Sequence, residues 1–342
     1  MYKLIRSLLF KLDPEFAHHL TLQLMRIGGL QPINFILQIL YTTPYKPVEA
    51  FGLTFKNPVG LAAGYDKDAV AVRGLSTLGF GHIEVGTVTP RPQPGNPKPR
   101  VFRLVEDEAV INRMGFPSRG EETMMRNLRH LYKAKSDRPN IILGVNLGKN
   151  KNTPNEEAVF DYLELLSNFA PLADYLAINV SSPNTVGLRQ LQGRDALHHL
   201  LTQLNYQRKI EETRLEKRIP LLVKLAPDLT DKELDEAIGV ILDTGMDGVI
   251  VTNTTLAREG LGSGHREESG GLSGSPLRVW SEALLEKIVR RVNGKIPVVS
   301  VGGIMSPADA KRRLDMGATL VQVYTGLIYR GPGLIKAIVK AI

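Results

Sequence analysis

From residue 57 onward, short apolar runs recur along the chain, and glycine or small polar residues follow the apolar part of most of them. The runs cover residues 57–64, 82–89, 141–148, 175–182, 220–227, 248–254, 297–304 and 319–326. Their apolar residues are nearly continuous rather than alternating, which is typical of parallel strands covered on both faces. Helical spacing or caps mark four of the connections, at 158–172, 195–215, 231–244 and 307–316. Eight such units predict an α/β fold, a (β/α)8 TIM barrel, rather than a doubly wound sheet.

Two connections between the runs differ from the rest. Residues 90–116 contain a proline-rich stretch followed by RVFRL and AVINRMGF, which predicts an inserted hairpin. Residues 255–276 are rich in glycine and polar residues, so we expect a mobile loop there.

The first 45 residues have a helical texture. Leu4, Ile5, Leu8, Leu9 and Leu12 fall on one helical face. Residues 14–27 and 33–41 predict two further helices, and Pro14 stands in the first turn of the former. The division is therefore an N-terminal helical subdomain at 1–45 and a barrel at 46–342. The helices either cap the barrel or form an interfacial element that lies on a membrane or gates an apolar tunnel.

Composition and charge narrow the function classes. The chain of 342 residues has no cysteine, which excludes disulfides, thiolate metal sites and any thiol nucleophile or base. The net charge of +8 is modest and the basic residues are spread along the chain, so we expect no nucleic-acid partner. The seven histidines lack metal-ligand spacing, so we expect no metal. The N-terminus has no secretory signal pattern, and the uncharged stretch 27–45 is too short and broken to span a bilayer.

Polar residues gather where the predicted strands end, which is the active-site face of such a barrel. Two lysines, Lys67 and Lys224, accompany several asparagines, a set that suits a flat anionic ligand rich in heteroatoms. Glycines 302–303 and 326 follow the seventh and eighth runs, where these barrels commonly bind phosphate. The alternative is a purely structural role, in which these glycines only allow the chain to turn.

Eight motifs in this order resemble the class 2, quinone-dependent dihydroorotate dehydrogenases, over essentially the whole chain. The motifs are AAGYDKD (62–68), INRMGF (111–116), GVNLGKN (144–150), NVSSPNT (179–185), VTNTT (251–255), GGLSG (270–274), VGGI (301–304) and VYTG (323–326). Tyr65 stands where the family pattern has leucine or phenylalanine. The resemblance implies oxidation of (S)-dihydroorotate to orotate in pyrimidine (UMP) biosynthesis, with one bound FMN and a membrane quinone as acceptor.

The resemblance also implies the site residues. Those expected to contact FMN are Ala63, Gly64, Tyr65, Asp66, Lys67, Thr87, Asn146, Asn179, Lys224, Thr252, Gly274, Gly303, Tyr324 and Thr325. Those expected to contact substrate are Lys67, Asn112, Arg113, Met114, Gly115, Phe116, Asn179, Asn184, Asn253 and Thr254. His18 and Arg103 match positions near the quinone path.

Ser182 matches the family's catalytic base for the C5 proton, while the C6 hydride goes to flavin N5. A hydroxyl is a weak base unaided, so we expect a relay through water or Thr185. The alternatives are a soluble class 1 dihydroorotate dehydrogenase, which uses a cysteine base, another FMN-dependent barrel oxidoreductase, a phosphate-sugar aldolase, and a non-enzymatic binding scaffold. The absence of cysteine argues against class 1.

The resemblance further implies a peripheral membrane protein, and the lack of a transit peptide favours the cytoplasmic face of a bacterial inner membrane. We expect a monomer. We also expect removal of residues 1–40 to abolish quinone reduction and to spare flavin reduction.

Overall fold

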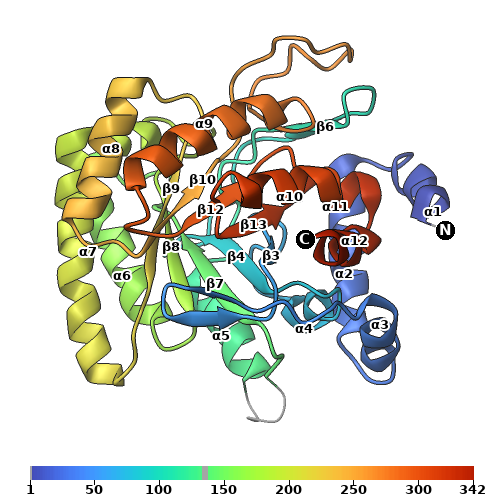
Figure 1. Ribbon diagram of the computed structural model, residues 1–342, viewed down its shortest axis with the longest axis horizontal. Coiled ribbons are helices and arrows are strands. Elements are labelled where there is room, and N and C mark those ends of the chain that lie inside the picture. Colours follow the sequence, from blue (N-terminus) through green and yellow to red (C-terminus); the bar gives the residue numbers. More distant parts are fainter. Residues whose placement is uncertain (1, 133–137) are drawn as a thin grey trace.

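The computed structural model describes residues 2–132 and 138–342 and contains a closed barrel of eight parallel strands (Figure 1). In barrel order these are β3 (Val59–Leu61), β4 (His82–Val88), β7 (Ile142–Leu147), β8 (Tyr175–Asn179), β9 (Leu221–Leu225), β10 (Gly248–Val251), β12 (Val298–Val301) and β13 (Leu320–Val323). The predicted (β/α)8 barrel is confirmed, and each strand lies within one predicted run. The runs extend beyond the strands because their last residues turn out of the ladder into the mouth of the barrel.

Helices cover the outside of the barrel (Figure 1). They are α4 (Val72–Ser76), α5 (Glu121–Leu131), α6 (Ala158–Phe169), α7 (Arg194–Leu215), α8 (Asp231–Asp243), α9 (Leu277–Val292), α10 (Pro307–Asp315), α11 (Thr325–Arg330) and α12 (Gly333–Ala341), with short 3-10 turns at Asn155–Glu157 and Leu188–Gln192. Thr230 and Glu233 form a reciprocal capping box at the start of α8.

The hairpin of β1 (Val48–Ala50) and β2 (Leu53–Phe55) closes the amino-terminal end of the barrel. The ring of Phe51 lies 6.3 Å from that of Tyr175, and the ring of Phe55 lies 5.4 Å from that of His82. Tyr175 and His82 are the first residues of β8 and β4. With this end plugged by aromatic rings, the carboxyl ends of the strands form the open face.

A second sheet lies over the open face. β5 (Val101–Leu104) and β6 (Ala109–Asn112) form the predicted hairpin, and β11 (Gly271–Gly274) pairs with β6. The prediction of a loop throughout 255–276 is therefore wrong in part. Leu272 is the reason, because its side chain is buried against Ile111, and one leucine among glycines gave no alternating pattern.

The N-terminal segment forms three helices, α1 (Tyr2–Leu9), α2 (Pro14–Gly28) and α3 (Ile33–Tyr41). They lie beside α4, α11 and α12 at one side of the barrel (Figure 1). The Asp13 carboxylate caps α2 by accepting from the backbone N–H groups of Glu15 and Phe16. Gly74 lets α4 approach α2 closely, since a Cβ there would lie 1.8 Å from the Met25 carbonyl oxygen.

Candidate active site

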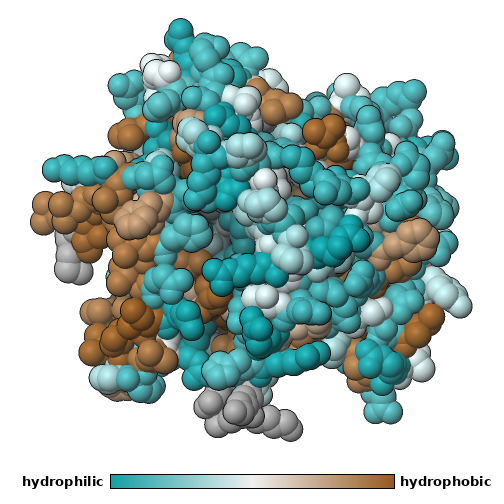
Figure 2. Space-filling view, turned by 180° about the vertical axis from the view of Figure 1, so that it is seen from behind, coloured by the Kyte–Doolittle hydropathy of each residue, from teal (hydrophilic) through white to brown (hydrophobic). Residues whose placement is uncertain are grey.

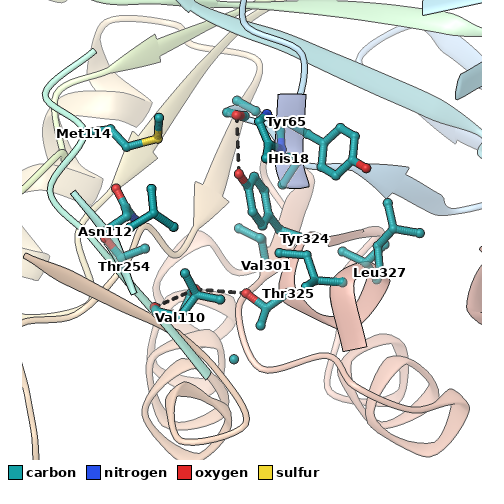
Figure 3. Close-up of a pocket in the computed structure, with 18 of the residues that line it drawn as sticks. His18, Tyr65, Val110, Asn112, Met114, Thr254, Val301, Tyr324, Thr325 and Leu327 are labelled. Atoms are coloured by element: carbon teal, nitrogen blue, oxygen red, sulfur yellow. Dashed lines mark hydrogen bonds between the residues drawn. The ribbon is translucent and has the colours of Figure 1, made fainter. Parts of the chain in front are cut away.

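One cavity lies between the barrel mouth, the three-stranded sheet and helices α1 and α2 (Figure 3). The space between its walls, open solvent included, is about 1760 Å³. In the view of Figure 3, Tyr324 stands between Asn112, Met114 and Thr254 on one side and His18 and Leu327 on the other. The cavity thus has a polar end and an apolar arm.

Hydrogen-bonded side chains from three neighbouring strands form the floor of the polar end. The Thr87 hydroxyl donates to Asn146 Oδ1 at 2.5 Å, and Asn179 Nδ2 donates to the same oxygen at 3.0 Å. Asn179 Nδ2 also lies 3.0 Å from Thr87 Oγ1. Because these amides hold one another in place, they present fixed donors and acceptors to a ligand.

Two lysines bring positive charge to the cavity. Lys67 Nζ donates to the Gly64 carbonyl oxygen at 2.6 Å, and burial lowers the pKa of Lys67 to about 8. Lys224 is 5% exposed, and burial lowers its pKa while the nearby Glu84 carboxylate opposes that shift. Both ammonium groups suit an anionic ligand at this end of the cavity.

The loop after β12 has the geometry of an anion cradle. Gly302 and Gly303 have φ of +109° and +71°, and a Cβ on Gly303 would lie 2.3 Å from the Arg278 Cα. Within the described ranges, the N–H groups of Gly303 and Ile304 donate to no other residue. Unused amides beside a cavity are what a phosphate group requires.

Asparagine and hydroxyl side chains also form the opposite wall of the polar end. Asn184 Nδ2 donates to Asn112 Oδ1 at 3.1 Å, and Asn253 Nδ2 donates to Ser181 Oγ at 3.0 Å. Asn residues offer both donors and acceptors, so this wall fits a ring that carries C=O and N–H groups.

Ser182 lies in the same wall, after β8. Its side chain is 5% exposed, and its Oγ accepts from the Asn184 N–H at 3.3 Å. The Thr185 hydroxyl is buried and has no hydrogen-bond partner among the described residues. The segment thus holds one hydroxyl that lines the cavity and, three residues on, a second with free hydrogen-bonding capacity.

The apolar arm runs from Tyr324 toward the N-terminal helices. The His18 ring lies 5.1 Å from that of Tyr65, and burial lowers the pKa of His18 to about 3, which keeps it neutral at physiological pH. The Arg103 guanidinium lies 4.8 Å over the Phe10 ring and donates to the carbonyl oxygens of Leu9 and Leu12. These residues tie the arm to α1 and α2.

Most of the predicted site residues line this cavity, and three do not. The Asp66 carboxylate accepts from the backbone N–H groups of Val70 and Ala71, so it holds a turn. Asn146 is fully buried beneath Thr87 and Asn179. Arg113 pairs with Glu268 at 2.6 Å and stacks on Phe102, away from the cavity.

Sequence reasoning missed several lining residues. They include Tyr2, Phe10, Glu15, Ser273, Leu277, Met305, Gln322 and Ile328. Tyr2 and Phe10 could have been suspected, because both are aromatic residues in the helical N-terminal segment. Tyr2 donates to the Ile328 carbonyl oxygen at 2.6 Å, and the Phe10 ring meets that of Tyr329 edge-on.

The sequence model of a known family matches most of the chain. The model is described as "Dihydroorotate dehydrogenase", and the match covers residues 46–342. The chain belongs to the dihydroorotate dehydrogenase family. Proteins named "Dihydroorotate dehydrogenase (quinone)" from Azotobacter vinelandii and Idiomarina loihiensis are 48% and 50% identical to it, over 100% and 99% of this chain and 96% and 99% of theirs. The resemblance to the quinone-dependent class is thereby confirmed.

Solved dihydroorotate dehydrogenases have the same fold. A structure from Eimeria tenella in complex with ferulenol superposes with a TM-score of 0.87 at 42% identity, covering 96% of this chain and 90% of that one. A ligand-free structure from the same organism gives the same score and identity, and covers 94% of that chain.

Two features are absent from residues 2–132 and 138–342. None of the helices in residues 2–132 and 138–342 is both long and apolar enough to cross a membrane. Over the same residues, no three histidine or acidic side chains gather as a metal site would require.

Proposed function

We propose that the protein oxidises (S)-dihydroorotate to orotate with one bound FMN and passes the electrons to a membrane quinone. The observation that carries this proposal is the single cavity, whose polar end of lysines and asparagines continues into an apolar arm beside α1 and α2. Such a cavity suits a polar anionic substrate at one end and an apolar electron acceptor at the other, with the cofactor between them.

The residues at the barrel mouth fit FMN. The unused N–H groups of Gly303 and Ile304 suit its phosphate, and Thr325 lines the same cavity. The floor of Thr87 and Asn179 suits its ring system. Lys224 contributes positive charge, which favours an electron-rich cofactor. The remaining lining residues assigned to FMN are Ala63, Gly64, Tyr65, Lys67, Thr252, Gly274 and Tyr324. When bound, FMN supplies the acceptor for the hydride that leaves C6 of dihydroorotate.

The opposite wall positions the substrate. Lys67 pairs with the substrate carboxylate, while Asn112, Asn184 and Asn253 hold the C=O and N–H groups of the ring. Met114, Gly115, Phe116 and Thr254 complete the wall. Ser182 Oγ takes the C5 proton, and the free Thr185 hydroxyl or a water carries a proton onward.

Apolar side chains cover the exposed faces of α1, α2 and α3. They include Leu4, Leu8, Phe16, Leu24, Phe35, Ile36 and Ile39, with Leu30 between α2 and α3, and each is more than one third exposed. Figure 2 shows a brown area at the edge of the molecule that carries these helices. This surface supports peripheral association with a membrane, the cytoplasmic face of the inner membrane in a bacterium, and a quinone would enter past His18 and Arg103. A monomer suffices for this arrangement.

Anaerobic half-reactions test the proposal. Dihydroorotate should bleach the flavin absorbance, and a short-chain quinone should restore it, whereas fumarate should not. Reoxidation by fumarate would favour a class 1 enzyme or another FMN-dependent barrel oxidoreductase. A colourless protein, or one that dihydroorotate does not bleach, would remove the proposal.

A further inference from the structure

A buried ion pair joins α2 to the segment before β5. Arg100 Nη2 lies 2.7 Å from Glu15 Oε1 and Arg100 Nε lies 3.1 Å from Glu15 Oε2, which is a two-pronged contact. Glu15 is 5% exposed and Arg100 is 8% exposed. Burial alone would raise the pKa of Glu15, but the hydrogen bonds and charge of Arg100 lower it overall. The carboxylate is therefore ionised and fixed to the guanidinium.

The other edge of the Arg100 guanidinium organises a turn. Arg100 Nη1 donates to the carbonyl oxygens of Pro94 and Asn96, at 2.6 Å and 2.9 Å. Glu15 thus orients the Arg100 side chain, and Arg100 in its place holds the backbone of residues 94–96 through these two hydrogen bonds. Because Glu15 is buried, its loss would leave the Arg100 charge without its counter-charge.

The turn at 94–96 also holds the backbone of the two segments proposed to bind substrate, residues 112–116 and the segment that contains Asn184. Asn96 Nδ2 donates to the carbonyl oxygens of Arg113 and Asn184, at 3.0 Å and 3.2 Å. The Asn96 N–H donates to the Met114 carbonyl oxygen at 2.9 Å. Gly115 packs directly on the Asn96 amide, since a Cβ there would lie 2.6 Å from Nδ2. One asparagine thus contacts the backbone of both walls assigned to dihydroorotate.

We propose that Glu15 is a positioning residue for the dihydroorotate site, acting through Arg100 and Asn96. The N-terminal helices then support the polar end of the cavity, where dihydroorotate would bind, as well as the apolar arm. This inference rests on the proposed function. It also changes the expectation for a protein lacking residues 1–40, because that deletion removes Glu15 together with the quinone arm.

The test compares full-length, FMN-loaded variants by titration with orotate, followed through the flavin absorbance. Glu15→Gln should raise the orotate Kd about tenfold, because small displacements of positioning groups weaken a site strongly. The dihydroorotate concentration for half-maximal flavin reduction should rise in parallel, with FMN content unchanged. Glu106→Gln, the same substitution at an exposed hairpin position, should leave the Kd within about twofold.

A double-mutant cycle separates positioning from general destabilisation. Asn96→Ala should also raise the orotate Kd, and its combination with Glu15→Gln should add little, because both act through one chain of contacts. Effects that multiply fully would overturn the inference, as would a folded Glu15→Gln protein with the wild-type Kd. If Glu15→Gln does not fold, Arg100→Lys answers the same question, and an unchanged Kd there overturns the inference too. Wild-type protein that fails to bind orotate would instead remove the proposed function.

Discussion

The Glu84 carboxylate lies beside the Lys224 ammonium inside the barrel, with Oε1 3.9 Å from Nζ. Glu84 has no exposed surface. Its two oxygens also accept from Asn146 at 2.8 Å, Gln322 at 2.9 Å and Tyr175 at 3.1 Å. The barrel interior therefore carries a fully hydrogen-bonded counter-charge for Lys224 directly beneath the cavity floor.

Substitution Glu84→Gln should be strongly destabilising. It leaves the buried Lys224 charge without its partner, and breaking such a pair costs about 3 kcal/mol or more. Urea denaturation measures the change in the free energy of unfolding. Glu286→Gln, which breaks an exposed pair with Arg290, is the matched control and should cost less than about 1 kcal/mol. Equal losses in the two variants would contradict this account of Glu84.

Orotate affinity should depend on the charge of Lys67. Burial lowers the pKa of Lys67 to about 8, so its ammonium is present below that pH and is lost above it. The Kd for orotate should be flat between about pH 6 and pH 7 and should rise toward tenfold per unit above about pH 8. Titrations of the flavin absorbance across this range measure it.

Lys67→Gln is the control for this pH dependence. With no charge to lose, the variant should bind orotate weakly and with a Kd that stays flat over the same range. If wild-type affinity is equally flat, Lys67 does not hold the substrate carboxylate.

The barrel and most of the site were predictable from sequence because their signals are local. Runs of buried apolar residues mark each strand, and residues such as Lys224 and Asn179 belong to those runs. Strand β11 was not predictable, since its partner β6 lies far away in sequence and supplies the packing for Leu272.

The same limit applies to individual roles. Asp66 lies in a motif assigned to FMN, but its carboxylate holds the turn at Val70 and Ala71. Glu15 gave no signal, because its importance depends on Arg100, 85 residues further along the chain. Sequence reveals which residue types are available near a site, whereas long-range contacts decide how each is used.

Membrane association should depend on the apolar surface of α1, α2 and α3. Phe35, on α3, is 59% exposed, and burying such a ring contributes about 1.5–3 kcal/mol. Phe35→Glu should therefore weaken binding to vesicles of anionic phospholipid at least about tenfold. Flavin reduction by dihydroorotate should not change. Phe160→Glu, on α6, where the ring is 66% exposed, should bind vesicles as wild-type does.

Alanine substitutions at two adjacent serines should impair different steps, flavin reduction in one case and orotate binding in the other. Ser182 lines the cavity, so Ser182→Ala should lower the limiting rate of flavin reduction by about 10²–10⁴ while orotate affinity changes little. Ser181 is fully buried and holds Asn179 and Asn253, so Ser181→Ala should mainly raise the orotate Kd. Anaerobic stopped-flow mixing with dihydroorotate separates the two effects. An unchanged limiting rate in Ser182→Ala would assign the base to another group, and Ser181→Ala controls for the loss of a serine hydroxyl at the neighbouring position.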